Sequence, residues 1–102
     1  MVVGDIVNDV VQMTTATTHN LQPALTVEII ITQVGHTTVA SANEIQTWLA
    51  DGVLTSVMFA NKITTMNPPA IMKMGITNSH YLTLWNGAAG TETLSYTGIQ
   101  IK

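Results

Sequence analysis

The sequence predicts a mainly β domain with one short α-helix, and two observations indicate this fold class. Threonine, which favours strands, makes up about one residue in six. Several segments alternate apolar and polar side chains with the period that a half-buried strand requires. A chain of 102 residues is expected to form one domain. A β-sandwich, a small barrel or a jelly-roll-like fold would each accommodate the predicted strands.

The first part of the chain, residues 1–18, fits two interpretations. Its apolar pairs recur every four residues, which suits a helix, but its β-branched content favours an extended conformation. We therefore expect an N-terminal strand or a partner-binding arm here, followed by a single β-rich domain over residues 19–102. The clearest strand of that domain is predicted over residues 24–34, and Gly35 is expected to end it.

One short helix is predicted over residues 42–50. Ser41 and Glu44 have the spacing of a capping box, in which each side chain bonds a backbone amide of the first turn. The apolar residues that follow have the i, i+3, i+4 spacing of one helical face, and they are Ile45, Trp48 and Leu49. A glycine then follows, at a position typical of a helix end.

Two further strands are predicted over residues 53–63 and 70–77, joined by a proline-containing connector. In the second of them, Met72 and Met74 share one face and Lys73 lies on the other. The two methionines fit either core filling or an adaptable contact surface, because methionine adapts to irregular gaps.

A closing hairpin is predicted from residues 81–85 and 91–101. The connecting residues include Asn86-Gly87, a pair that tolerates the positive φ angles of hairpin turns. Gly98 interrupts the alternation of the return strand and is expected to mark a bulge.

The charged fraction of the chain is 9%, against roughly 25% in a typical soluble protein. This surface is either coated by threonine and asparagine or covered by partner proteins, and we favour the second interpretation because interface cores are depleted of charge. The net charge of −3 and the three lysines argue against a nucleic-acid partner. The apolar runs are far shorter than a membrane span requires, so no membrane partner is expected.

The sequence contains no motif for catalysis, cofactor binding or metal binding that we recognise. There is no cysteine, so thiolate chemistry is excluded. His19, His36 and His80 stand far apart in polar surroundings. They are expected to be solvated or locally bonded, with a histidine at an interface and a three-histidine metal site as alternatives. We therefore expect no catalytic, cofactor-binding or metal-binding residues, no cofactor and no enzymatic activity.

The two tryptophans and the N-terminal segment are the candidate contact elements. Trp48 is expected in the core, on the apolar face of the predicted helix, whereas Trp85, beside the hairpin loop, fits a structural role, an interface anchor or a sugar-stacking platform. The residues predicted to contact a partner are four apolar residues of the N-terminal segment, together with Trp85 and the first two residues of the hairpin loop. They are Val2, Val3, Ile6, Val7, Trp85, Asn86 and Gly87.

The segment 81–101, YLTLWNGAAGTETLSYTGIQI, resembles the hairpins of small virion proteins of tailed bacteriophages. With its small size, its lack of cysteine and its Thr/Val/Ala/Asn bias, the chain is similar in style to capsid decoration (cement) proteins. The quoted segment is about a fifth of the chain, and no specific motif carries a functional residue over.

This resemblance implies a β-rich viral structural protein on the capsid surface of a virion, often as a homo-oligomeric trimer. Its partner would be the major capsid protein or another virion protein, held by many repeated contacts. Residues 1–18 would be the arm that adds a strand to that partner. The alternative is a small β-sandwich module that binds carbohydrate through Trp85 and nearby Asn and Thr side chains.

Overall fold

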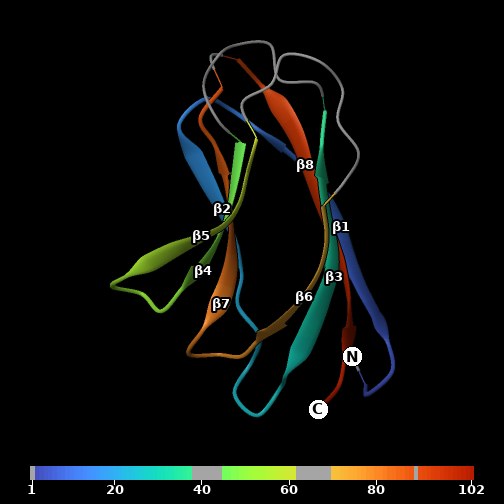
Figure 1. Ribbon diagram of the computed structural model, residues 1–102. Coiled ribbons are helices and arrows are strands. Elements are labelled where there is room, and N and C mark those ends of the chain that lie inside the picture. Colours follow the sequence, from blue (N-terminus) through green and yellow to red (C-terminus); the bar gives the residue numbers. More distant parts are fainter. Residues whose placement is uncertain (1, 38–44, 62–69, 89) are drawn as a thin grey trace.

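The computed structural model describes residues 2–37, 45–61, 70–88 and 90–102. These residues form eight strands in two four-stranded antiparallel sheets, and no helix is found among them (Figure 1). The fold is therefore mainly β, as predicted. The strands are β1 (Ile6–Met13), β2 (Thr17–Leu21), β3 (Ile29–His36), β4 (Ile45–Ala50), β5 (Thr55–Asn61), β6 (Ala70–Ile76), β7 (Tyr81–Asn86) and β8 (Glu92–Gln100).

The first sheet has the strand order β1-β8-β3-β6, and the second sheet has the order β2-β7-β4-β5. The two sheets form separate layers that face one another, an arrangement compatible with a β-sandwich (Figure 1). The chain passes from one sheet to the other at every connection except the one between β4 and β5. Most strands therefore pair with strands that are distant in the sequence.

The helix predicted over residues 42–50 is wrong, because Ile45–Ala50 form β4 between β7 and β5. Ile45 and Thr47 face the first sheet and are each 2% exposed, while Trp48 lies half-buried on the outer face. The apolar residues therefore lie on both faces of a strand. Pairing with the neighbouring strands outweighs the local helical pattern of the sequence. The predicted capping residues, 41 and 44, lie outside the described residues.

The hairpin predicted from residues 81–85 and 91–101 is also wrong. Both segments are strands, but β7 pairs with β2 and β4, whereas β8 pairs with β1 and β3. Neither Asn86 nor Gly87 has the positive φ of a hairpin turn. Asn86 instead begins a connection that crosses from the second sheet to the first.

The other predicted strands are found with shifted bounds. The segment 24–34 overlaps β3 only over residues 29–34. β3 runs on from Ile29 to His36, so Gly35 lies inside the strand and does not end it. Thr26, with φ of 70°, turns the chain before β3 begins. The segments 53–63 and 70–77 contain β5 and β6, and the residues after β5 lie outside the described part of the chain.

The core lies between the sheets and is built from inward-facing aliphatic side chains. The isoleucines and leucines among them that are at most 1% exposed are Ile29, Ile31, Ile76, Leu82, Leu84 and Leu94. Each such side chain contributes roughly 1.5–3 kcal/mol relative to leaving it in water. Met74 is buried in this core and Met72 packs against it, while Lys73 on the opposite face is exposed, so core filling describes both methionines.

The bulge predicted at Gly98 is found on the neighbouring strand. The register of β3 shifts between Ile31 and Gln33, opposite Gly98 and Thr97 of β8, so the extra residue is Thr32. A Cβ atom on Gly98 would lie 2.4 Å from the carbonyl oxygen of Ile30. The glycine therefore lets the bulged strand approach β8 closely.

Candidate interaction surfaces

The outer face of the first sheet carries exposed aliphatic side chains. Ile6 of β1, Ile99 of β8 and Ile30 of β3 stand directly opposite one another in the strand pairing, so they form a row across three strands. Ile6 is 71% exposed and Ile99 is 43% exposed. We define the aliphatic face as this row together with the exposed Val10 and Ile71.

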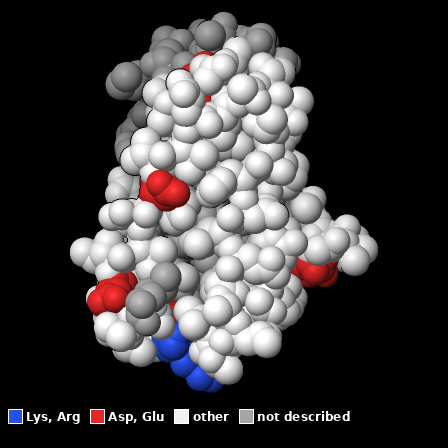
Figure 2. Space-filling model, turned by 180° about the vertical axis from the view of Figure 1, so that it is seen from behind, with Lys and Arg blue, Asp and Glu red and all other residues white. Residues whose placement is uncertain are grey.

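Charge is scarce on the aliphatic face. Side chains alternate between the two faces of a strand, so the residues at every second position of β1, β8, β3 and β6 point outward. Among the outward positions of these described strands, Lys73 is the one charged side chain. The view from behind, which looks at the edges of both sheets and not onto this face, also shows acidic side chains as isolated spots on a mostly uncharged surface (Figure 2). The outer face of the first sheet therefore presents little charge to solvent.

The N-terminal residues lie beside one end of the aliphatic face. The amide of Gly4 donates to the carbonyl oxygen of Gln100 at 2.8 Å, and the amide of Val2 donates to a carboxylate oxygen of Asp5 at 2.9 Å. These bonds hold the turn at residues 2–5 against the end of β8. Val2 and Val3 are 64% and 66% exposed, so they extend the apolar surface beyond β1.

The outer face of the second sheet differs, because aromatic and neutral polar side chains dominate it. Trp48 of β4 and Trp85 of β7 stack with their ring centroids 5.7 Å apart and an interplanar angle of 23°. The indole nitrogen of Trp48 donates to the side-chain oxygen of Gln46 at 2.6 Å. Both rings are half-buried. The stack and the hydrogen bond together fix the orientation of Trp48.

A shallow hollow of about 200 Å³ lies beside Trp48 on this second sheet. Its lining comes from β2, β7, β4, the turn before β5 and the first residue of β5: Thr18, Asn20, Trp48, Ala50, Gly52, Val53, Leu54, Thr55, Tyr81 and Thr83. Thr83 and Ala50 are 4% and 5% exposed, so they form its floor. Trp48 and Tyr81 are half-buried and rise beside that floor.

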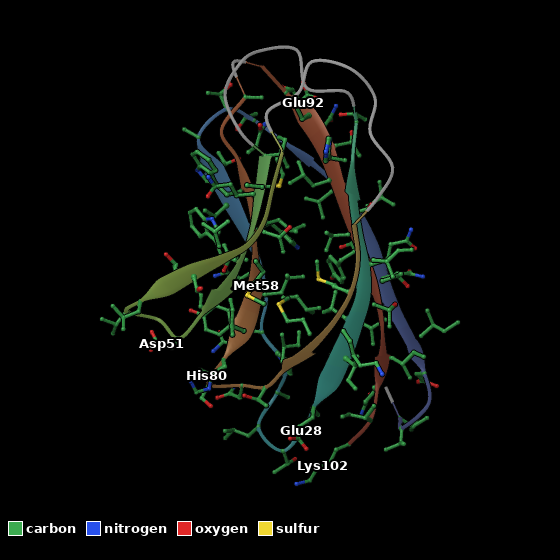
Figure 3. The ribbon with its side chains drawn as sticks, in the orientation of Figure 1. Glu28, Asp51, Met58, His80, Glu92 and Lys102 are labelled. Atoms are coloured by element: carbon green, nitrogen blue, oxygen red, sulfur yellow. The ribbon has the colours of Figure 1, made fainter. Side chains whose placement is uncertain are left out.

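The connection between β4 and β5 projects from the second sheet and is held by Asp51. Its carboxylate accepts hydrogen bonds from the amides of Leu54 at 2.7 Å and Val53 at 2.9 Å. These two bonds, with a smaller contribution from the nearby His80, lower the pKa of Asp51 (Figure 3). Val53 and Leu54 are 89% and 71% exposed, so the turn presents two apolar side chains to solvent.

Two further contacts between ionisable groups lie elsewhere in the described residues. No group of three or more histidine, cysteine, aspartate or glutamate side chains is positioned to hold a metal within the part of the chain that the structure describes. Burial raises the pKa of Tyr96, and the nearby Asp9 raises it further. Glu28 and Lys102 form a partly exposed ion pair at 3.7 Å, where the two labels meet in Figure 3.

The structure separates the residues that were predicted to contact a partner. Val2, Val3 and Ile6 are exposed together at the aliphatic face, whereas Val7 is 8% exposed and belongs to the core. Of the predicted arm, residues 6–13 form β1 and residues 17 and 18 begin β2, so these parts lie within the two sheets. A contact of this segment with a partner stays a prediction.

The predicted contact residues near Trp85 also have separate surroundings. Trp85 lies on the outer face of the second sheet, away from the aliphatic face. Asn86 is fully buried, and its side chain bonds the backbone of the protein itself. Gly87 is half-buried in the connection that follows.

Sequence reasoning missed two features of these surfaces. The row of Ile6, Ile99 and Ile30 depends on strand pairs that are far apart in the sequence, so no local pattern indicated it. Trp48 was assigned to a helix, and its stack on Trp85 therefore could not be anticipated.

Comparisons with protein-family models, with curated proteins and with solved structures found no match to this chain. Among the described residues, the structure contains no helix of the length and apolar character needed to cross a membrane.

Proposed function

We propose that this protein is a non-enzymatic structural subunit, of the capsid decoration (cement) type, on the surface of a bacteriophage virion. The observation that carries the proposal is the aliphatic face, whose row of three isoleucines contains the exposed Ile6 and Ile99, on a protein with few charges. Exposed apolar patches of this kind mark protein–protein contact sites. The major capsid protein, or another virion protein, is the proposed partner.

The strand order supports a finer description of the fold. The strand orders β1-β8-β3-β6 and β2-β7-β4-β5 support our proposal that the two sheets form a double-sheet jelly roll. Viral capsid proteins and lectins both use jelly rolls, so the fold is consistent with the proposal without deciding it. The aliphatic face is the feature that favours the capsid decoration role.

The proposed mechanism is burial of the aliphatic face without any chemical step. Copies of the chain associate through this face, with a trimer as the expected state, and the oligomer then binds neighbouring capsid subunits. Linking several weak contacts raises the overall affinity by roughly 10²–10⁴ without a new kind of contact. The shortage of charge lowers the cost of removing the surface from water.

The test is the solution mass of the purified chain, measured by light scattering after size exclusion. We expect the wild type to be a defined oligomer and Ile99→Lys to be a monomer, because a lysine in the middle of the row would be buried unpaired. Val57→Lys is the matched control, since Val57 is 54% exposed and lies on the second sheet. A wild type that stays monomeric at high concentration would overturn the self-association.

A second measurement tests the partner. The wild type and Ile99→Lys are each mixed with undecorated capsids of tailed bacteriophages and then sedimented. Co-sedimentation of the wild type, and its loss in Ile99→Lys, would support the decoration role. No co-sedimentation with any such capsid would count against it.

A further inference from the structure

We infer that the hollow on the outer face of the second sheet binds one ring of a neutral carbohydrate. This inference goes beyond the proposed structural role, because it concerns the face opposite the aliphatic face. It rests on three features of the hollow: its aromatic sides, its unoccupied polar groups and its lack of charge.

The aromatic sides of the hollow are positioned before any ligand arrives. Trp48 is held by its stack on Trp85 and by its hydrogen bond to Gln46. Tyr81 lies directly opposite Ala50 in the pairing of β7 with β4, at the other end of the floor. A sugar ring has one face of C–H groups that packs against aromatic rings, and a side chain already fixed in place loses little entropy on binding.

The polar groups of the hollow are available and oriented. The hydroxyl of Thr83 donates to the side-chain oxygen of Asn20 at 2.7 Å, so the amide nitrogen of Asn20 keeps both hydrogens for a ligand. Within the described part of the chain, no partner is found for that nitrogen or for the hydroxyls of Thr18 and Tyr81. These donors and acceptors match the hydroxyl groups around a sugar ring.

The absence of charge selects the class of carbohydrate. None of the ten residues that line this hollow is charged. A hollow on the same sheet contains Asp51 and His80, and another hollow contains Glu28 and Lys102. A sulfated or carboxylated sugar would meet no cation in the Trp48 hollow, whereas a neutral hexose or N-acetylhexosamine would leave no charge unpaired.

The volume of about 200 Å³ limits the site to about one sugar ring, and the hollow is shallow. A dissociation constant on the order of 1 mM is therefore expected for a simple glycoside. The repeated copies of a surface assembly would raise the effective affinity for a polymeric glycan.

Intrinsic fluorescence provides the experiment, because both tryptophans of the chain lie on this face. The protein is titrated with methyl glycosides of glucose, galactose, mannose, N-acetylglucosamine and N-acetylgalactosamine, and separately with glucose 6-sulfate and sialic acid. We expect a saturable change with at least one neutral glycoside and weaker binding of the anionic sugars. No saturable change with any neutral glycoside, or stronger binding of an anionic sugar, would overturn the inference.

Variants locate the site. Asn20→Ala removes an exposed side chain and is expected to weaken the binding of the neutral glycoside about tenfold. Asn8→Ala, an equally exposed asparagine on the first sheet, is the matched control and should bind as the wild type does. Equal binding by wild type and Asn20→Ala would show that the sugar lies elsewhere.

The same titration on Ile99→Lys separates this inference from the proposed function. Ile99 lies on the other sheet, so the variant should bind the glycoside even where self-association is lost. Loss of sugar binding in Ile99→Lys, with the fold intact, would contradict a site within one chain.

Discussion

The side-chain amide of Asn86 donates to the carbonyl oxygen of Met13 at 2.9 Å, which ties the end of β7 in one sheet to the end of β1 in the other. The same nitrogen also lies within hydrogen-bonding distance of the carbonyl oxygens of Thr14 and Gly90, and the side-chain oxygen accepts from the amide of Ala88. One buried asparagine thus satisfies backbone groups from two connections at the same end of the molecule.

Replacing Asn86 with alanine should destabilise the protein by about 3 kcal/mol, because several backbone groups near it would lose their partner. Urea denaturation followed by circular dichroism measures the loss. Asn8→Ala, whose side chain is exposed on β1, is the control and should change stability by no more than about 0.5 kcal/mol. A loss for Asn86→Ala as small as that of the control would contradict the structural role.

Replacing Gly98 with alanine should destabilise the protein by about 2 kcal/mol, because the new Cβ would collide with the backbone of Ile30. Gly75→Ala is the matched control, since a Cβ on Gly75 of β6 meets nothing within 4 Å. Thermal unfolding of the two variants should show a lower midpoint for Gly98→Ala alone. An unchanged midpoint would mean that β3 and β8 separate at little cost.

The raised pKa of Tyr96 predicts a loss of stability in alkaline solution. The folded state holds the phenolic proton more tightly than the unfolded state, whose pKa is near 10.0. The stabilisation is therefore complete below pH 10 and is lost as the pH rises through the folded-state pKa. Tyr96→Phe should flatten this alkaline fall of the unfolding free energy. Absorbance titration of the wild type and of Tyr96→Phe should show that the phenol absent from the variant ionises above pH 10.

The lowered pKa of Asp51 predicts an acid-sensitive turn. A folded-state pKa below the ordinary value of 3.8 means that the carboxylate stabilises the turn above that pH, and that the effect disappears as the pH falls through the folded-state pKa. Asp51→Ala should therefore speed amide hydrogen exchange at Val53 and Leu54 at neutral pH. Asp9→Ala is the control, because the Asp9 carboxylate accepts a hydrogen bond from the amide of Val10 on the other sheet, and it should leave both amides unchanged.

Local alternation in the sequence predicted the strands better than it predicted their partners. Residues 70–77 contain β6 with Met72 and Met74 on the inner face, because a period of two follows directly from strand geometry. The closing segment contains β7 and β8, but its turn signal implied a pairing between them that does not exist. An alternating pattern indicates which face of a strand is buried, whereas the neighbouring strand in the sheet depends on the whole fold.

The helix error has a different cause. The i, i+3, i+4 spacing of Ile45, Trp48 and Leu49 fits one face of a helix. In the structure the same three residues lie on both faces of a strand, whose register against β5 is irregular. Because the sequence placed Trp48 in a helix, it could not predict the stack of Trp48 on Trp85 or the hollow beside Trp48. Val2 and Val3 are exposed, and their predicted contact with a partner stays a prediction.

The central place of β8 has a consequence for synthesis on the ribosome. β8 lies between β1 and β3, yet its first residue is made about 80 residues after β1 ends. Because synthesis adds roughly 5–20 residues per second, β1 and its valines remain unpaired with β8 for several seconds. Nascent chains therefore spend that interval with open strand edges, and chaperones that shield such edges should raise the yield of native protein.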